Sequence, residues 1–395
     1  MSGVTADYGR PPAGLGTTGA TRRMITAAVV VVLVIAGIAG LSLAGAQRVP
    51  HGSGAASLSV RPEAGASTDS AAFLHRYLAA NGRVVRWDQG GDTVSEGQGY
   101  AMLVAVATGN KRAFAAAWNW ERTHLQLADG LFAYHWRDGA VVDGQSASDA
   151  DLDTAWALVL AGQRFGVPAY GVEGQRVASA ILDQESAVVA GRLELVAGPW
   201  ARTNPSVVNP SYLAPQAMEA LGRATGDPRW SQLASATTAL VTDVVAHSRG
   251  GLLPNWVDIA PDGSAHPVGS PSGTGTPTYG LDAQRAPVWL AASCTRADRT
   301  AAAGAWPTLG HAAQGGAAVS YTLSGQAMDR TVNPLGLVAA AAAARASGHA
   351  AETTSLLAQA DQQSGKRHTY YGDAWTALGR ILLDTNWLSP CPSSA

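Results

Sequence analysis

Charged residues are scarce in this sequence. Asp, Glu, Lys and Arg together make up 14% of its 395 residues, and the formal net charge is −2. Nucleic acids and anionic membrane surfaces attract proteins that carry a strong positive field, so this balance argues against both as partners. Hydrophobic residues make up 47% of the chain, which is enough to bury a large core in roughly one to three domains.

Cysteine is equally rare. Only Cys294 and Cys391 occur, and two thiols without a cluster of suitably spaced histidines do not make a zinc site. An exported chain can oxidise two cysteines to a disulfide. The sequence does not show whether these two lie close together, so a disulfide and two unpaired thiols both stay open.

One long hydrophobic run stands near the N-terminus. Residues 26–46 are uncharged and apolar over about the 20 residues that a membrane-spanning helix needs. Arg22 and Arg23 precede the run, so the positive-inside rule places the N-terminus in the cytoplasm and the rest of the chain outside. The polar region before the run is long for a cleaved signal peptide, which favours a retained anchor, although the small residues at 44–46 keep cleavage and secretion open.

The next stretch, residues 47–69, is rich in Gly, Ser, Ala and Pro and lacks apolar periodicity, as flexible linkers do. We therefore expect five parts: a cytoplasmic tail (1–23), a membrane segment (24–46), a flexible linker (47–69), a folded domain (70–389) and a short C-terminal tail (390–395).

Strand-like alternation is also scarce in the folded domain, where helical patterns recur instead. Ala- and Leu-rich helices stand in pairs at 101–118, 216–236 and 336–360. A glycine follows the first helix of each pair, as expected where a helix ends and a positive φ is favoured. The repeated unit is a helical hairpin, and about a dozen helices predict an all-α fold. Stacked hairpins form either an open solenoid or a closed ring. Segment 261–278 is rich in Pro and Gly, so we expect a loop without a regular element there.

The segment SEGQGYAM, residues 95–102, sets one carboxylate at the start of a helix. Gly97 and Gly99 leave space beside Glu96, so that another molecule could approach the carboxylate. An alternative is a capping box, in which Thr93 caps the helix and Glu96, three residues later, reaches back to the Thr93 amide. Both interpretations stay open on this motif alone.

A second acidic segment, residues 147–161, places Asp149, Asp151 and Asp153 at the start of another apolar helix. Acids are favoured there by the helix dipole. Helical geometry puts Asp149 and Asp153 on one face and turns Asp151 elsewhere. The spacing also resembles the start of a calcium loop, but the Gly and distal Glu of an EF-hand are missing, so calcium is the weaker interpretation.

A third segment, residues 279–291, places Asp282 and Arg285 one helical turn apart. Such a pair is usually a weak surface ion pair. The combination carries more weight: acids begin three separate helices in a chain with twelve Trp and only four Phe. Aromatic rings present flat apolar faces with a polar edge, which suits the C–H face of a sugar. Carboxylates with such platforms predict carbohydrate chemistry.

These segments resemble glycoside hydrolase family 8, which contains exported endoglucanases, chitosanases, lichenases and xylanases. The blocks occur in the family's order and span approximately residues 70–385: SEGQGYAM (95–102), ASDADLDTAWALVLAGQRF (147–165), NPSYLAP (209–215), YGLDAQRAP (279–287) and YYGDAWTALG (370–379). WNW (118–120) is similar to the cellulases that accompany cellulose synthase. The resemblance implies an (α/α)6 barrel, an inverting endo-β-1,4-glucanase, no metal or other cofactor, and possible association with a cellulose-synthesis machine.

The resemblance also implies roles for individual residues. Glu96 matches the proton donor, Asp149 a carboxylate near the scissile sugar, and Asp282 the base. The candidates for substrate binding are Trp136, Asp153, Tyr212, Arg285 and Tyr371. Of these, Trp136 and Tyr371 are equally well explained as packing residues.

Two positions depart from the family pattern. Thr154 stands where the family has Ile or Met, which we expect to affect packing only, and Leu281 stands where a Tyr usually precedes the base. The second departure keeps another class of function open, a glycan-binding or scaffold protein that has lost turnover. A third possibility is the same hydrolase acting on chitosan, xylan or mixed-linkage glucan.

The chemistry makes one further demand. A general acid must hold its proton near working pH, whereas a helix N-terminus favours the ionised form of Glu96. A second carboxylate close by raises the proton affinity of the first. We therefore expect Asp149 to lie beside Glu96, and Gly97 and Gly99 to admit the glucan chain.

Overall fold

The computed structural model describes residues 62–388 and residue 391, which belong to one compact unit. The tail (1–23) and membrane segment (24–46) lie outside the described residues. Among those described, no helix combines the length and hydropathy needed to cross a bilayer. The linker prediction needs a correction: helix α1 begins at Pro62, so residues 62–69 are helical. The domain therefore starts earlier than residue 70.

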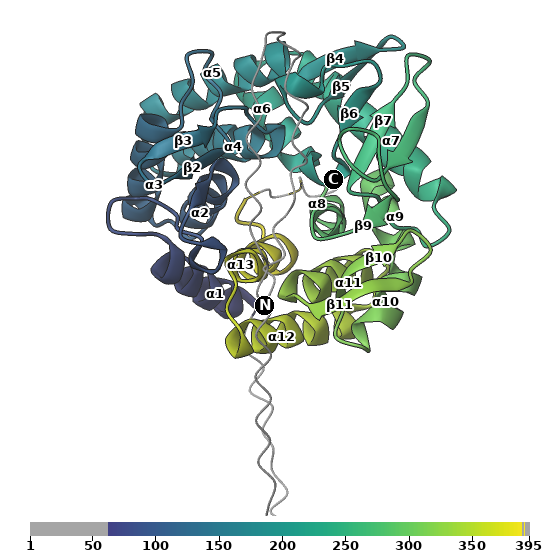
Figure 1. Cartoon of the computed structure of the whole chain (residues 1–395). Helices are drawn as coiled ribbons and strands as arrows, with labels where there is room; N and C mark the ends of the chain where they lie inside the picture. Colours follow the sequence, from purple (N-terminus) through teal and green to yellow (C-terminus); the bar gives the residue numbers. More distant parts are fainter. Residues whose placement is uncertain (1–61, 389–390, 392–395) are drawn as a thin grey trace, which may run out of the picture. The chain divides into compact units, whose positions relative to one another are not determined.

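The described helices form two rings (Figure 1). The inner ring contains α2 (Ser95–Ala107), α4 (Ser148–Arg164), α6 (Pro215–Thr225), α8 (Ala286–Ala291), α11 (Pro334–Ala346) and α13 (Tyr370–Asp384). The outer helices are α1 (Pro62–Tyr77), α3 (Lys111–His124), α5 (Pro168–Gln184), α7 (Arg229–His247), α9 (Arg296–Gly304), α10 (Trp306–Ala313) and α12 (Ala350–Lys366).

Burial explains which helices lie inside. Every residue of α2 and of α8 is buried, whereas the outer helices α3, α5 and α7 bury only one side. A helix that is apolar all round needs neighbours on every side, and an amphipathic helix can cover it while facing water. Each outer helix packs against inner helices, most of them against one that adjoins it in the chain, whereas α1 packs mainly against α13.

The inner ring is closed. Each inner helix contacts the next in the order α2, α4, α6, α8, α11, α13, and α13 contacts α2 again. This closure, which the sequence left open, is consistent with the predicted (α/α)6 barrel. In this order α2 and α8 stand opposite each other across the ring.

The two ends of the ring carry different connections. The links from inner to outer helices are short: 108–110, 165–167, 226–228, 292–295 and 347–349. The expected glycines occupy three of them, and Gly109, Gly226 and Gly348 have φ values of 73°, 69° and 81°. All described strands lie instead in the links from outer to inner helices. The N-termini of the inner helices therefore share one end with all the long loops, which is where binding residues are usually found.

The strands form four small antiparallel sheets. Their members are β1 (Thr93–Val94), β2 (His135–Arg137) and β3 (Ala140–Asp143); β4 (Ser186–Val189) and β5 (Arg192–Leu195); β6 (Ser206–Val208), β7 (Trp256–Ile259) and β8 (Ala265–Val268); and β9 (Thr278–Tyr279), β10 (Ala318–Thr322) and β11 (Ala327–Val332).

Strand β8 corrects the prediction that segment 261–278 holds no regular element. It pairs with β7 in a register that sets Val257 opposite Pro267. Because β8 is the edge strand of its sheet, its proline removes no hydrogen bond that an inner neighbour needs.

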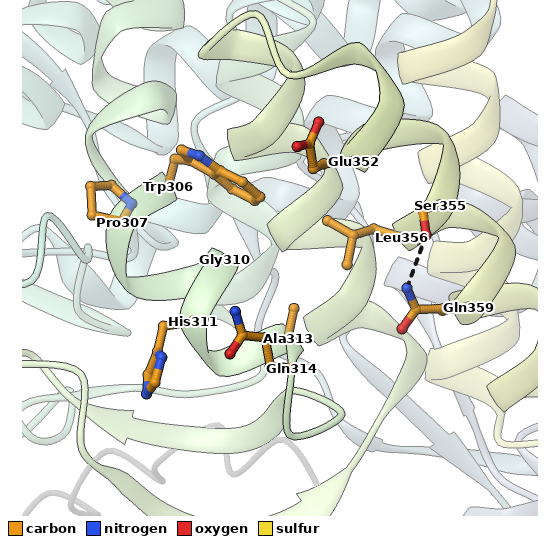
Figure 2. Close-up of a pocket in the computed structure, with 10 residues that line it drawn as sticks. All are labelled: Trp306, Pro307, Gly310, His311, Ala313, Gln314, Glu352, Ser355, Leu356 and Gln359. Carbon is orange, nitrogen blue, oxygen red and sulfur yellow. Dashed lines mark hydrogen bonds between the residues drawn. The ribbon is translucent and has the colours of Figure 1, made fainter.

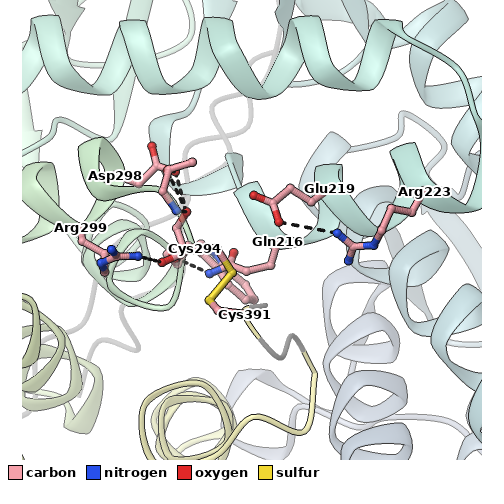
Figure 3. Close-up of a disulfide and its surroundings, with 10 residues drawn as sticks. Gln216, Glu219, Arg223, Cys294, Asp298, Arg299 and Cys391 are labelled. Carbon is pink, nitrogen blue, oxygen red and sulfur yellow. Dashed lines mark hydrogen bonds and ion pairs between the residues drawn. A yellow bond between two sulfur atoms is a disulfide. The ribbon is translucent and has the colours of Figure 1, made fainter. Parts of the chain in front are cut away.

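The two cysteines form a disulfide, with their Cα atoms 5.4 Å apart (Figure 3). Cys294 follows α8, in a turn where Ser293 donates a hydrogen bond of 2.6 Å to Asp298 and Arg299 donates one of 2.8 Å to the Ser293 carbonyl. Cys391 follows α13 and thereby joins residue 391, predicted as tail, to the domain. Both helices have ended at this point, so the disulfide lies at the end of the ring opposite the long loops.

Candidate active site

The predicted acids stand at the N-terminal ends of inner helices. Glu96 is the second residue of α2 and Asp149 the second of α4. Asp282 and Arg285 belong to the turn that leads into α8. Since the inner helices begin at the end of the ring that carries the long loops, segments far apart in the sequence can converge there.

Arg285 joins these segments. Its Nη1 lies 2.7 Å from Asp149 Oδ2 and 3.1 Å from Glu96 Oε2. Nη1 also donates to the Tyr100 hydroxyl at 2.9 Å, and Nη2 donates to Ser211 Oγ at 2.7 Å. The side chain is 1% exposed. Burial acts to lower the pKa of Arg285, but the surrounding phenols and carboxylates outweigh it and raise the pKa well above its ordinary value.

Glu96 faces this centre, so the capping-box interpretation is wrong. The N-cap of α2 is Val94, which makes no side-chain cap. Thr93 lies in β1, and its hydroxyl donates to the Val84 carbonyl at 2.7 Å. The other oxygen of Glu96, Oε1, accepts a hydrogen bond of 3.5 Å from the Tyr370 hydroxyl at the start of α13.

The two glycines of this segment do not serve the purpose that the sequence suggested. A Cβ at Gly97 would lie 2.9 Å from the Tyr370 hydroxyl, and one at Gly99 would lie 3.1 Å from the Asp153 Cβ. The missing side chains thus make room for α13 and α4 of the same chain. The expectation that they admit the glucan is corrected: they let the helices that carry the site approach one another.

Asp149 lies beside Glu96 as expected, because both bind the same guanidinium nitrogen. That cation offsets the repulsion between the two carboxylates on which the sequence argument relied. Asp153 lies on the same side of α4. Burial first, and then the charges of Asp149 and Glu96, raise the pKa of Asp153 well above its ordinary value.

Asp151 points elsewhere, as predicted, and its Oδ1 accepts a hydrogen bond of 2.9 Å from the Phe132 amide. The acids of this segment therefore have separate partners. Among the described residues, no group of three His, Cys, Asp or Glu side chains is arranged to hold a metal ion. The arrangement gives the calcium interpretation no support.

Asp282 shares its surroundings with Glu96 and Asp149. Its Oδ2 lies 3.5 Å from Asn209 Nδ2, and its backbone carbonyl accepts from Arg285 Nε at 3.4 Å. Three tyrosines interact electrostatically with all three acids. Burial and the negative charges of the acids raise the pKa values of Tyr134, Tyr212 and Tyr371. The three carboxylates therefore surround one centre, with Glu96 and Asp282 coming from opposite helices of the ring.

The predicted aromatic contacts divide into two groups. The Tyr212 ring lies 5.2 Å below the Arg285 guanidinium, and burial and the charges of the three acids raise the pKa of Tyr371. Trp136 is not joined to them. Its ring packs 5.5 Å from the Trp120 ring and lies 4.3 Å below the Arg83 guanidinium. For Trp136 the geometry favours the packing interpretation.

The two departures from the family pattern are both buried. Thr154 does more than pack, because its hydroxyl donates to the buried carboxylate of Glu121 at 3.1 Å. This corrects the expectation of a packing effect only. Leu281 is 9% exposed and belongs to the main hydrophobic cluster.

Several neighbours of the acids were not predicted as site residues: Tyr100, Tyr134, Asn209, Ser211 and Tyr370. Four of them stand inside the quoted motifs, so the motifs themselves were the available signal. Tyr134 has no such signal. Its carbonyl accepts from the Ser95 amide at 3.0 Å, because β2 pairs with β1 just before α2.

Comparison with known proteins places this geometry in a family. The model described as glycosyl hydrolases family 8 matches residues 55–384. The chain is 32% identical to a probable endoglucanase of Novacetimonas hansenii over 227 residues, which cover 56% of this chain and 65% of that protein. It is 34% identical to an endoglucanase of Salmonella typhi over 197 residues, 47% of this chain and 52% of the other. The chain thus spans less than two thirds of these relatives' lengths.

Solved structures agree on the fold. The endo-beta-1,4-glucanase of Acetobacter xylinum superposes with a TM-score of 0.67 at 26% identity, covering 81% of this chain and 98% of that chain. A beta-1,3-1,4-glucanase of Paenibacillus sp. X4 reaches a TM-score of 0.74 at 21% identity, covering 83% and 94%. The second likeness concerns the fold alone.

Proposed function

Because the chain belongs to glycosyl hydrolases family 8, we propose that it is an inverting endo-β-1,4-glucanase that cleaves β-glucan chains such as cellulose. The observation that carries this proposal is the binding of the Glu96 and Asp149 carboxylates by one guanidinium, that of Arg285, in the turn that also carries Asp282. The endoglucanases among the relatives support glucan as the substrate class.

An inverting hydrolase needs an acid that protonates the leaving oxygen and a base that deprotonates water on the opposite face of the sugar. Glu96 and Asp282 come from helices on opposite sides of the ring, which suits these two roles. We assign Glu96 as the acid and Asp282 as the base. The transferred proton is assigned to Glu96 Oε1, because Oε2 is bound by Arg285.

Asp149 and Arg285 act on charge. The cleaved sugar develops positive charge in its transition state, which a nearby carboxylate stabilises. Asp149 supplies that charge, and Arg285 holds its Oδ2 at 2.7 Å so that the oxygen does not turn away. Arg285 also holds Glu96 and Asp149 close together, because its positive charge offsets their mutual repulsion. Tyr212, whose ring lies below Arg285, is proposed as a sugar contact.

The test compares Glu96→Gln with Glu352→Gln. Both changes remove one carboxylate, but Glu352 is an exposed residue of α12. Loss of the general acid should lower the release of reducing ends from carboxymethylcellulose by about 10²–10⁴-fold, with oligosaccharide binding retained. Glu352→Gln should hydrolyse as the native chain does. Normal turnover by Glu96→Gln would show that the assignment of the acid is wrong.

The same preparation separates the alternatives. Reducing-end release from chitosan, xylan and mixed-linkage glucan identifies the preferred polymer. Binding without hydrolysis of any polymer would support the glycan-binding interpretation instead. Inversion is checked by the anomeric NMR signal of the first product, since an inverting enzyme acting on β-glucan releases the α-anomer.

Two predictions rest on the sequence alone. Residues 24–46 are proposed to anchor the chain outside the cytoplasm, or to be cleaved and leave it secreted, and membrane fractionation of the full chain tests this. Association with a cellulose-synthesis machine is proposed from the resemblance of WNW (118–120) to accompanying cellulases, and co-purification with the synthase tests it.

A further inference from the structure

Trp87 differs from every other tryptophan of the chain. All twelve lie among the described residues, and only Trp87 is exposed, with 62% of its surface accessible. Single exposed apolar residues are common on protein surfaces. Exposure alone is therefore no evidence of a function. The evidence comes from the position of the ring in the fold and from the hydrogen bonds that hold it.

The position is at the loop end of the ring. Trp87 begins the short 3-10 helix η1 (Trp87–Gln89), which lies between α1 and α2. The next residue, Asp88, accepts a hydrogen bond of 3.0 Å from the Tyr370 amide, and the Tyr370 hydroxyl bonds Glu96. The preceding residue, Arg86, places its guanidinium 6.0 Å from the Tyr370 ring. Both chain neighbours of Trp87 thus contact a residue that touches the proposed acid.

The ring is also held in place. Trp87 Nε1 donates to the Arg76 carbonyl at 3.1 Å. Arg86 binds Asp92 through two hydrogen bonds of 2.8 and 2.7 Å, and its carbonyl accepts from the Gln89 amide at 2.9 Å. A fixed side chain loses little conformational entropy when a ligand binds. The exposed ring is therefore presented in one orientation.

These contacts define the chemistry that the ring can offer. The indole N–H is the only donor of a tryptophan side chain, and here it is used within the protein. What faces solvent is a flat apolar surface, which suits the C–H face of a pyranose. We infer that Trp87 is a stacking platform for a β-linked glucose unit of the substrate chain, at a distance from the bond that is cleaved.

This inference rests on the proposed function and adds a subsite to it. A surface pocket elsewhere on the domain offers a comparison. It has a volume of about 580 Å³ and lies between α10 and α12, lined by Trp306, Gly310 and Glu352 among others (Figure 2). The Trp306 ring contacts the His349 ring at a centroid distance of 5.1 Å, with the two ring planes tilted by 35°. Because both of its helices belong to the outer ring, Trp306 is a suitable control tryptophan.

The first experiment measures how hydrolysis depends on chain length. A sugar far from the cleaved bond is present only in longer substrates. Trp87→Ala should lower the ratio of kcat/KM for cellohexaose to kcat/KM for cellotetraose by about 3- to 10-fold, the size of an aromatic contact. Trp87→Phe should keep most of the ratio, Trp87→Leu should lose it, and Trp306→Ala should keep it. An unchanged ratio in Trp87→Ala would overturn the subsite.

The second experiment measures binding without turnover, so that the two hypotheses can fail separately. In the Glu96→Gln background, cellohexaose should shift the tryptophan fluorescence to shorter wavelength, and Trp87→Phe should remove most of that shift. Trp87-dependent binding by a native chain that cleaves nothing would support the subsite and overturn the proposed hydrolysis. Hydrolysis with a fluorescence shift unaffected by Trp87→Phe would overturn the subsite alone. No binding of cellohexaose would overturn both.

Discussion

Removal of the Arg285 guanidinium tests the electrostatic centre of the site. Arg285→Met keeps much of the side-chain volume but leaves Glu96 and Asp149 buried without their shared cation. Breaking a buried ion pair by deleting one partner costs about 3–5 kcal/mol. Tyr100 and Ser211 also lose their donors. With a urea m-value of about 3 kcal/mol/M, the unfolding midpoint should fall by about 1–1.7 M.

A matched control separates burial from charge. Arg229 also binds two carboxylates, Asp183 and Asp227, but 40% of its side chain is exposed. Arg229→Met should cost about 1 kcal/mol or less, because exposed ion pairs contribute little. Urea unfolding followed by tryptophan fluorescence measures both variants against the native chain. Equal midpoint shifts for Arg285→Met and Arg229→Met would refute the account of Arg285 as the shared, buried cation of Glu96 and Asp149.

Two further predictions concern stability. Burial raises the pKa of Glu185, next to Asp151, from 4.5 to about 8, so the stabilisation by the bound proton is complete below about pH 4.5 and is lost as the pH rises towards 8. The side chain of Glu185→Gln cannot ionise, so the free energy of unfolding of this variant should fall less than that of the native chain as the pH rises from 4.5 to 8. The difference should be up to about 1.4 kcal/mol per pH unit. If the urea midpoints of the variant and of the native chain changed equally between pH 5 and pH 8, this would contradict the prediction. The disulfide joins cysteines separated by 97 positions, and closure of a loop of about 100 residues predicts that Cys391→Ser lowers the unfolding free energy by about 2–5 kcal/mol. Dithiothreitol should then destabilise the native chain but not the variant, and equal effects on both would count against the bond.

Local sequence signals predicted much of the helical framework. Glycines with positive φ end the first helix of each quoted pair, because few other residues adopt that conformation. The acids begin α2 and α4, where the helix dipole favours them. Asp149 and Asp153 share a side of α4, because helical spacing alone determines which residues share a face.

The errors arose where a distant segment decided the outcome. We expected Gly97 and Gly99 to leave space for a ligand, but Tyr370 and Asp153 from other helices fill that space. The capping box, one of two interpretations left open for Thr93 and Glu96, is wrong because pairing with Trp136 places Thr93 in β1. The proline in β8 led us to expect no strand in that segment, but an edge strand tolerates a proline.

By itself the sequence determined a chain of paired helices, carboxylates at particular helix starts and, through its motifs, the family. These are local properties, since propensity, capping and periodicity act within a few residues. Only the tertiary structure decided that the ring closes, that Arg285 binds Glu96 and Asp149 together, that Tyr134 joins them while Trp136 does not, and that the cysteines pair. Each of these depends on contacts between segments tens to hundreds of residues apart, and such contacts form only when the whole core packs.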